Sequence, residues 1–134
     1  YIGFADLEIT ARDMARFGQL YLDGGQFEGN QIVPAEWVRD SLQTYSEDAW
    51  YFAVGKNWRD SGYGYQWWSI RAGDHRYNLA WGHGGQQIAL LHELDMVVVA
   101  TADPLYGQTG DKPWRLEKAN LNLVADFIAS LPSE

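Results

Sequence analysis

Cysteine is absent from the 134 residues of this sequence. Without thiols the chain can form no disulfide framework, no cysteine nucleophile and no cysteine-ligated zinc site. A protein without cysteine suits a reducing compartment and an export route equally well, so the compartment stays open.

Basic residues are scarce. The chain carries 10 Lys and Arg against 18 Asp and Glu, a formal net charge of -8, and no cluster of Lys and Arg occurs along it. A surface of this sign repels the phosphates of nucleic acids and anionic lipids. We therefore expect no nucleic-acid partner.

Long apolar runs are also missing. No stretch reaches the about 18 consecutive apolar residues of a membrane-spanning helix, and the first residues do not read as a signal peptide. No Met precedes Tyr1, and a composition of 46% hydrophobic and 21% charged residues is ordinary for a globular domain. We expect a single domain over residues 1–134, without a membrane span, that is part of a longer protein.

The first third of the sequence, residues 10–44, predicts two helices and a small hairpin. Thr10 and Asp13 form a typical helix N-cap with an acidic residue at the third helical position. Apolar residues then recur on one face at helical spacing. A helix is predicted over residues 10–23.

A pair of glycines ends this first helix, and a hairpin is predicted over residues 27–32, turning on Gly29-Asn30. Pro34 suits the first turn of a helix because its missing N–H needs no partner there. The second helix is therefore predicted over residues 34–42, with Trp37 packed inward.

The middle of the sequence predicts an antiparallel meander over residues 62–103. Short runs of β-branched and aromatic residues between turn residues indicate strands. An irregular aromatic stretch before them, residues 44–60, is predicted to be a loop. The predicted strands cover residues 62–70, 76–81, 86–92 and 96–103.

The last predicted element is a helix over residues 113–131. Its apolar residues cover more than half of its circumference, so we expect it to pack on the sheet. Helices at both ends with antiparallel strands between them predict the α+β class: an antiparallel sheet meander with flanking helices.

Glycines cluster around one histidine in Gly82-His83-Gly84-Gly85-Gln86, between two predicted strands. Glycine weakens a strand and marks either a bulge or a place where the backbone comes close to something else. A ligand lying against the backbone is one such partner. The local pattern alone leaves a simple bulge and a ligand site open.

Other constellations are less specific. His75, His83 and His92 lie on different predicted elements without the His-x-x-x-His spacing of a helical zinc site, so no metal site is predicted. A triad of Ser69, His83 and either Asp95 or Asp103 lacks the Gly-x-Ser-x-Gly elbow that would accompany it.

Aromatic residues are abundant, and Tyr63, Tyr65, Trp67 and Trp68 alternate across two faces of a predicted strand. Such rings fill a core on one side and cover loops on the other. They would also suit stacking on sugar rings. A non-catalytic carbohydrate-binding or scaffold module is therefore the alternative to an enzyme.

Five segments, in this order, resemble the C-terminal part of the serine β-lactamase-related family, which includes class C β-lactamases, penicillin-binding-protein-like peptidases, family VIII esterases and 6-aminohexanoate-dimer hydrolases. The resemblance covers nearly the whole chain and implies the C-terminal portion of a β-lactamase/transpeptidase-like fold. The segments are Thr-Ala-Arg-Asp-Met-Ala-Arg-Phe-Gly-Gln-Leu-Tyr-Leu (10–22), the Gly-Gly turn after it, Ile-Val-Pro-Ala-Glu-Trp-Val (32–38), Gly-Tyr-Gly-Tyr-Gln-Trp-Trp (62–68) and Gly-His-Gly-Gly-Gln (82–86).

The resemblance implies an acyl-enzyme mechanism without a cofactor. The family uses a Ser-x-x-Lys nucleophile, a Tyr-x-Asn or similar motif, and a Lys-Thr-Gly or His-x-Gly strand motif, to which His83-Gly84-Gly85 corresponds. By the same implication, Gly84 and Gly85 leave room for substrate and the backbone N–H of Gln86 is an oxyanion donor. Histidine in place of lysine favours ester, amide or peptide substrates without an obligatory carboxylate.

The other two family motifs are missing. Thr109-Gly110-Asp111-Lys112 is the only hydroxyl-x-x-Lys sequence, and Tyr106-Gly107-Gln108 comes nearest to Tyr-x-Asn. With no nucleophile, the chain is expected to be inactive alone and to need the N-terminal portion of the same protein.

An isolated piece of such a fold would expose a strand edge and apolar surface, so we also expect it to self-associate. The resemblance favours a periplasmic or secreted location, and a cytoplasmic one stays open.

Overall fold

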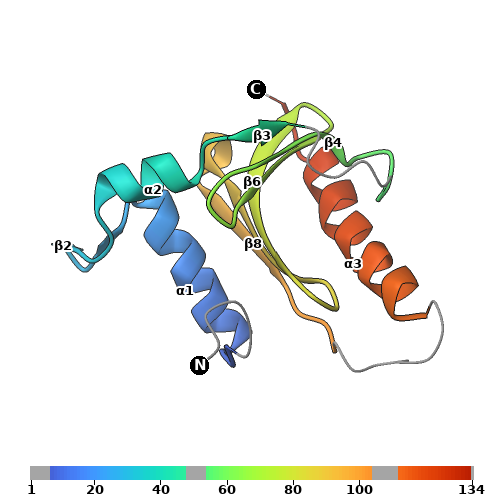
Figure 1. Ribbon diagram of the computed structural model, residues 1–134, viewed down its shortest axis with the longest axis horizontal. Coiled ribbons are helices and arrows are strands. Elements are labelled where there is room, and N and C mark those ends of the chain that lie inside the picture. Colours follow the sequence, from blue (N-terminus) through green and yellow to red (C-terminus); the bar gives the residue numbers. More distant parts are fainter. Residues whose placement is uncertain (1–6, 48–53, 104–111, 134) are drawn as a thin grey trace.

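The computed structural model describes residues 7–47, 54–103 and 112–133. Helix α1 (Ala11–Leu22) and helix α3 (Lys112–Ala129) lie on opposite faces of an antiparallel sheet (Figure 1). The predicted α+β class is therefore confirmed. None of the helices in these described ranges is long and apolar enough to cross a bilayer.

Helix α1 begins where the sequence predicted. The hydroxyl of Thr10 accepts a hydrogen bond from the backbone N–H of Asp13 at 3.2 Å, which satisfies one of the N–H groups left unpaired at a helix start. Its buried residues Met14, Gly18 and Tyr21 face the last two strands of the sheet.

A small hairpin and a short helix follow. Strands β1 (Gln26–Phe27) and β2 (Asn30–Gln31) pair around Glu28 and Gly29, whose φ values of 49° and 78° are both positive, so the turn lies one residue earlier than predicted. Helix α2 (Ala35–Ser41) confirms the second predicted helix.

The prediction that Trp37 packs inward is wrong. Its side chain is 50% exposed and stacks on the ring of Tyr65, with the ring centroids 5.5 Å apart. Helix α2 has only 7 residues and buries Val38 and Ser41, so its single buried face does not include Trp37.

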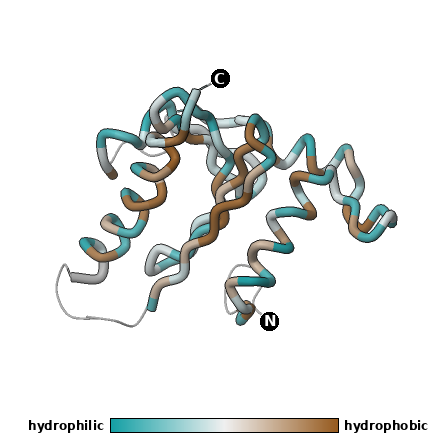
Figure 2. Tube along the Cα trace, turned by 180° about the vertical axis from the view of Figure 1, so that it is seen from behind, coloured by the Kyte–Doolittle hydropathy of each residue, from teal (hydrophilic) through white to brown (hydrophobic). Residues whose placement is uncertain are grey.

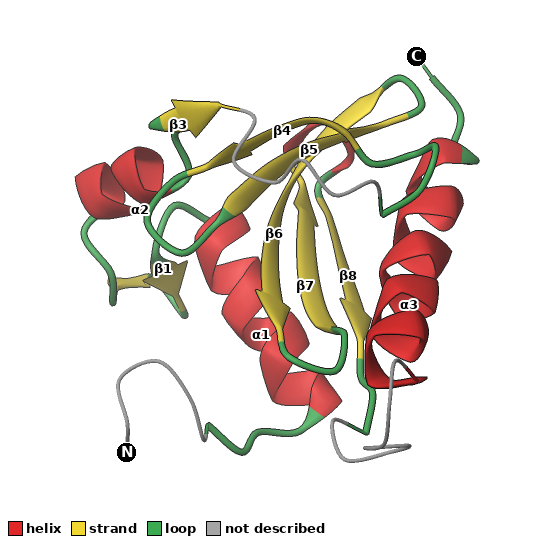
Figure 3. Cartoon of the chain, turned by 45° about the vertical axis from the view of Figure 1, so that its right-hand side comes forward, coloured by secondary structure: helices red, strands yellow, loops and turns green. Residues whose placement is uncertain are grey.

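Among the described residues, the main sheet has six strands in sequence order, each antiparallel to the next (Figure 3). The predicted meander is confirmed over its last three strands, although the final strand ends at Ala100, three residues early. The strands are β3 (Ser46–Glu47), β4 (Arg59–Tyr63), β5 (Trp68–Ala72), β6 (His75–Gly82), β7 (Gln86–Leu91) and β8 (Met96–Ala100).

The single strand predicted over residues 62–70 is wrong. These residues form the end of β4, a turn and the start of β5. The N–H of Gly64 donates to the carbonyl of Trp67 at 2.8 Å, and Gln66 has a φ of 67°. Gly64 also packs so closely on the backbone carbonyls of Ser41 and Gln43 that a side chain would collide with them.

The loop predicted over residues 44–60 is only partly correct. Strand β3 and the beginning of β4 lie inside it, and the two strands pair with one another, Ser46 opposite Tyr63 and Glu47 opposite Gly62. Residues 48–53 of this stretch lie outside the described residues. The pairing of β3 with β4 depends on a partner that local sequence periodicity does not show.

Two hydrophobic cores occupy the two faces of the sheet. Figure 2 shows apolar residues along the central strands and on the side of α3 that faces them. The prediction that the last helix packs on the sheet is confirmed, because Leu121, Val124 and Ile128 are buried in the larger core with β5, β6 and β7. Leu123 and Phe127, on the outer face of α3, are 66% and 46% exposed.

Candidate functional site

The glycine cluster forms the turn between β6 and β7. Strand β6 ends at Gly82 and β7 begins at Gln86, so His83-Gly84-Gly85 form a hairpin turn. The family resemblance implied that these three residues lie on a strand, and that expectation is wrong. The N–H of Gly85 donates to the carbonyl of Gly82 at 3.0 Å. Gly84 and Gly85 have φ values of 87° and 95°, a backbone conformation that favours glycine.

Gly85 faces helix α3. A Cβ atom on Gly85 would lie 3.2 Å from the Cβ of Asn120 and 3.4 Å from the Cα of Glu117. The space beside Gly85 is therefore taken up by the helix, and the glycine allows the turn and the helix to pack closely.

Helix α3 contributes a buried carboxylate to this turn. Glu117 is 5% exposed; one of its oxygens accepts the indole N–H of Trp81 at 2.9 Å and the other accepts the backbone N–H of Gly84 at 2.8 Å. The Nδ1 atom of His83 lies 3.3 Å from the second oxygen. His83 itself projects outward, with its side chain 79% exposed.

Asn120, one turn after Glu117, completes the link between helix and turn. Its side-chain N–H donates to the carbonyl of Gly85 at 2.6 Å, and its own backbone carbonyl accepts from the buried side chain of Gln87 at 3.0 Å. Neither Glu117 nor Asn120 was predicted from the sequence as a site residue. The available signal was the position of Glu117, which falls in line with the buried Leu121, Val124 and Ile128 of the same helix.

A cavity of about 520 Å³ lies beside the turn. The pairing of β5 with β6 ends at Trp68 opposite Leu79, so residues 80–82 have a described strand, β7, on one side only (Figure 3). Gly82 and Gln86 both line the cavity at this edge. The other lining residues are Leu7, Met14, Tyr63, Gln66, Trp68, Ala80, Trp81 and Ile88.

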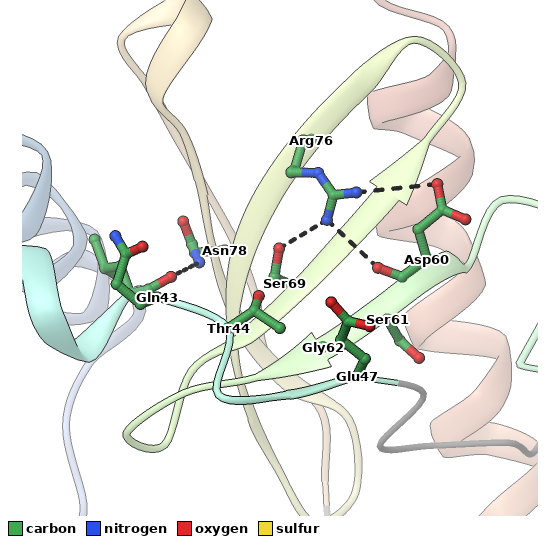
Figure 4. A pocket seen from close by; sticks show the side chains of 10 residues that line it. Gln43, Thr44, Glu47, Asp60, Ser61, Gly62, Ser69, Arg76 and Asn78 are labelled. Carbon is green, nitrogen blue, oxygen red and sulfur yellow. Dashed lines mark hydrogen bonds and ion pairs between the residues drawn. The ribbon is translucent and has the colours of Figure 1, made fainter.

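A second cavity, of about 610 Å³, lies on strands β4, β5 and β6, away from the turn (Figure 4). Its lining is polar: the guanidinium of Arg76 donates to the hydroxyl of Ser69 at 2.9 Å and lies 3.9 Å from the carboxylate of Asp60. None of the residues 82–86 lines this cavity.

The structure does not assemble the alternative triad. Ser69 pairs with Asn78, five residues before His83, and its hydroxyl accepts from Arg76 instead. The His83 turn precedes β7, whereas Asp95 comes after the other end of this strand. At about 3.4 Å per strand residue, the length of β7 separates His83 from Asp95 by about 20 Å.

The three histidines are also apart. His75, at the start of β6, is buried and its Nε2 lies 3.3 Å from the carbonyl oxygen of Leu131, whereas His83 follows the other end of the same strand. Burial lowers the pKa of His92 below its ordinary value. Within the described ranges, no group of three or more His, Asp or Glu side chains could hold a metal ion.

The aromatic cluster divides between the core and the surface. Trp67 is 4% exposed and packs on Tyr21, with centroids 4.9 Å apart. Tyr65 is exposed and lies between Trp37 and Tyr45 in a stack of three rings, 4.8 Å from the ring of Tyr45.

Comparisons with known proteins agree with this fold. The chain is 35% identical over 101 residues to a 6-aminohexanoate-dimer hydrolase of Paenarthrobacter ureafaciens, across 72% of this chain and 25% of that protein. A solved structure from Bacillus anthracis, whose name assigns it as a 6-aminohexanoate-dimer hydrolase, superposes with a TM-score of 0.57 and 28% identity over 92% of this chain and 30% of its own length. No family model matches.

The chain therefore spans less than a third of the length of either relative. The matched segments include the two flanking helices and the meander, because the structural superposition covers 92% of the chain. The resemblance to the β-lactamase-related family is therefore confirmed: in sequence and in fold the chain is similar to a part of the 6-aminohexanoate-dimer hydrolases.

Proposed function

We propose that this chain supplies one wall of the active site of a serine hydrolase that cleaves an ester, amide or peptide bond through an acyl-enzyme. The nucleophile belongs to the N-terminal portion of the same protein, because the sequence contains no Ser-x-x-Lys motif. The chain alone is then inactive. Acyl transfer of this kind needs no cofactor.

The observation that carries this proposal is the cavity at the edge of β6. The cavity lies beside the end of β6 that continues past its pairing with β5, and its volume of about 520 Å³ is within the size range of small-molecule sites. Its largely apolar lining, including Trp68 and Met14, suits the apolar part of a substrate.

The roles of the turn residues are those that the family resemblance implies. The backbone N–H of Gln86, a residue that lines the cavity, is the proposed oxyanion donor, and Gly84 is proposed to let the backbone approach the substrate. His83 offers an imidazole where a lysine would place a permanent cation. Substrates without an obligatory carboxylate fit this replacement of lysine by histidine.

The test uses the complete protein that contains this chain. A serine-directed acylating probe should label that protein and leave the isolated chain unlabelled, and the complete protein should hydrolyse simple esters or linear amides. An unlabelled complete protein without such activity would contradict the proposal.

A substitution in the cavity tests the location of the site. Gly82→Ala adds a methyl group at an ordinary contact distance, 3.4 Å from Oε1 of Gln86, so it fills part of the cavity without straining the turn. We expect a higher KM for the larger substrates. Gly29→Ala, in the remote β1–β2 hairpin, is the control for an added methyl group away from the cavity; its positive φ of 78° confines any strain to that hairpin, so KM should not change.

A non-catalytic carbohydrate-binding or scaffold module remains the second candidate, on one observation. The exposed rings of Trp37, Tyr65 and Tyr45 form a surface stack of the kind on which sugars can lie. Saturable quenching of tryptophan fluorescence by a polysaccharide, lost in Trp37→Ala, would favour it. Unchanged tryptophan fluorescence in that titration, together with acylation of the complete protein, would favour the hydrolase.

A further inference from the structure

The carboxylate of Glu117 has both of its oxygens committed to the β6–β7 turn. One accepts from the indole of Trp81 at 2.9 Å, and the other accepts from the backbone of Gly84 at 2.8 Å. Glu117 is 5% exposed and lies on helix α3, 33 residues after Gly84 in the chain. Buried carboxylates are costly unless they are hydrogen-bonded, so this one is held by specific partners.

Only a carboxylate can satisfy both donors at once. A carboxamide of the same shape has one acceptor oxygen and one N–H₂ group, which would face either the N–H of Trp81 or that of Gly84. The arrangement therefore requires a glutamate at position 117, beyond the need for a side chain of that size.

The same carboxylate faces the imidazole of His83. Nδ1 of His83 lies 3.3 Å from the oxygen that accepts from Gly84, and its ring is otherwise largely exposed. A negative oxygen beside one ring nitrogen favours a proton on that nitrogen. The neutral imidazole then carries its lone pair on Nε2, on the outward side of the ring.

We propose that Glu117 is the positioning residue of the candidate site: its carboxylate fixes the Gly82–Gln86 turn and sets the tautomer of His83, so that Nε2 presents a hydrogen-bond acceptor to substrate. The catalytic consequence rests on the function proposed above. The effect on the turn and on the imidazole is a property of this chain alone.

A purely structural link between helix and turn would not set the tautomer. Asn120 already ties α3 to the carbonyl of Gly85 at 2.6 Å, so the helix would remain attached without Glu117. The protonation pattern of His83 is the readout that distinguishes positioning from attachment.

The first experiment is ¹⁵N NMR of the imidazoles in the isolated chain, at a pH where they are neutral. We expect the proton of His83 on Nδ1, whereas a free imidazole prefers it on Nε2. In Glu117→Gln the His83 proton should move to Nε2, and the amide resonance of Gly84 should shift upfield as its charged acceptor is lost. Asp126→Asn removes an exposed carboxylate from the same helix and should change neither signal.

A His83 proton on Nε2 in the wild-type chain would overturn the inference, and this measurement needs no variant to fold. Unchanged His83 and Gly84 signals in a folded Glu117→Gln would overturn it as well.

The second experiment measures kcat and KM of the complete protein. Glu117→Gln should lower kcat by about tenfold or more, short of the about 10²–10³-fold loss of an oxyanion donor, with KM little changed. An unaffected kcat in an active enzyme would overturn the catalytic part of the inference. If the wild-type complete protein is neither acylated nor active, the proposed function fails, and the effect of Glu117 on the turn is judged by the NMR result alone.

Discussion

Gly18 of helix α1 lies directly on Val97 of strand β8: a Cβ atom on Gly18 would be 2.5 Å from Cγ1 of Val97 and 3.0 Å from Cγ2 of Ile88. The missing side chain lets the helix approach the last two strands closely. Helix α1 thereby covers β7 and β8 and leaves the polar side chains of β4, β5 and β6 on the same face of the sheet uncovered.

Gly18→Ala should destabilise the protein. Alanine improves the helix interior by about 1 kcal/mol, but forcing a methyl group into this contact costs about 1–3 kcal/mol, so we expect a net loss of about 1 kcal/mol. Urea unfolding followed by tryptophan fluorescence measures it. Combining Gly18→Ala with Val97→Ala should recover part of the loss, and a more stable single variant would show that the helix can move away freely.

Gly85→Ala should cost more than Gly29→Ala. Both glycines have positive φ, 95° and 78°, but only at Gly85 would a Cβ atom meet a neighbouring side chain, that of Asn120 at 3.2 Å. We expect about 1 kcal/mol for Gly29, from backbone strain alone, and about 2–3 kcal/mol for Gly85. Equal losses in chemical denaturation would mean that the contact with α3 adds nothing.

Tyr77→Phe should leave the protein as stable or make it more stable by about 1 kcal/mol. Tyr77 is 1% exposed, and within the described residues its hydroxyl has no hydrogen-bond partner. Removing an unpaired buried hydroxyl removes a desolvation cost while the ring keeps its packing. A loss of more than about 1 kcal/mol would reveal a partner for the hydroxyl.

The same residue predicts a dependence of stability on alkaline pH. Burial raises the pKa of Tyr77 well above its ordinary value. Above pH about 10 the unfolded chain releases this proton and the folded chain keeps it, so the free energy of unfolding falls as the pH rises. The fall should be shallower in Tyr77→Phe. Parallel curves for the two proteins would contradict this assignment.

Self-association of the isolated chain stays a prediction. The outer face of α3 exposes Leu116, Leu123 and Phe127, which are 44%, 66% and 46% accessible and lie along one side of the helix. Sedimentation velocity should show a concentration-dependent oligomer that Leu123→Lys with Phe127→Lys weakens. Phe27→Lys, at a similarly exposed ring in the small hairpin, should have no effect, and a strictly monomeric wild type would refute the prediction.

The sequence alone predicted most of the elements that depend on neighbours along the chain, although it placed the β1–β2 turn one residue too late. Thr10 caps α1 through Asp13, three residues away, and the apolar period of α3 follows from its own residues. The sequences of β6, β7 and β8 are short segments of alternating or continuous apolar residues, separated by turn residues. Their order and antiparallel pairing were therefore predictable.

Only tertiary structure decided the break between β4 and β5 and the exposure of Trp37. Gly64 turns where it does because the carbonyls of Ser41 and Gln43 lie against it, and Trp37 finds its ring partner in Tyr65. Neither contact leaves a periodic signal, because each joins segments that are brought together only by folding.

The candidate site shows the same division. The glycines around His83 marked the candidate segment from sequence, but the resemblance implied a strand there, whereas the structure has a turn in which Gly84 and Gly85 take positive φ values. The carboxylate that holds this turn comes from Glu117, 33 residues beyond Gly84, and no local pattern links the two. The residue types thus marked the segment, whereas the packing of α3 on the sheet decided which charged group it meets, because burial and hydrogen bonding depend on distances that exist only in the folded protein.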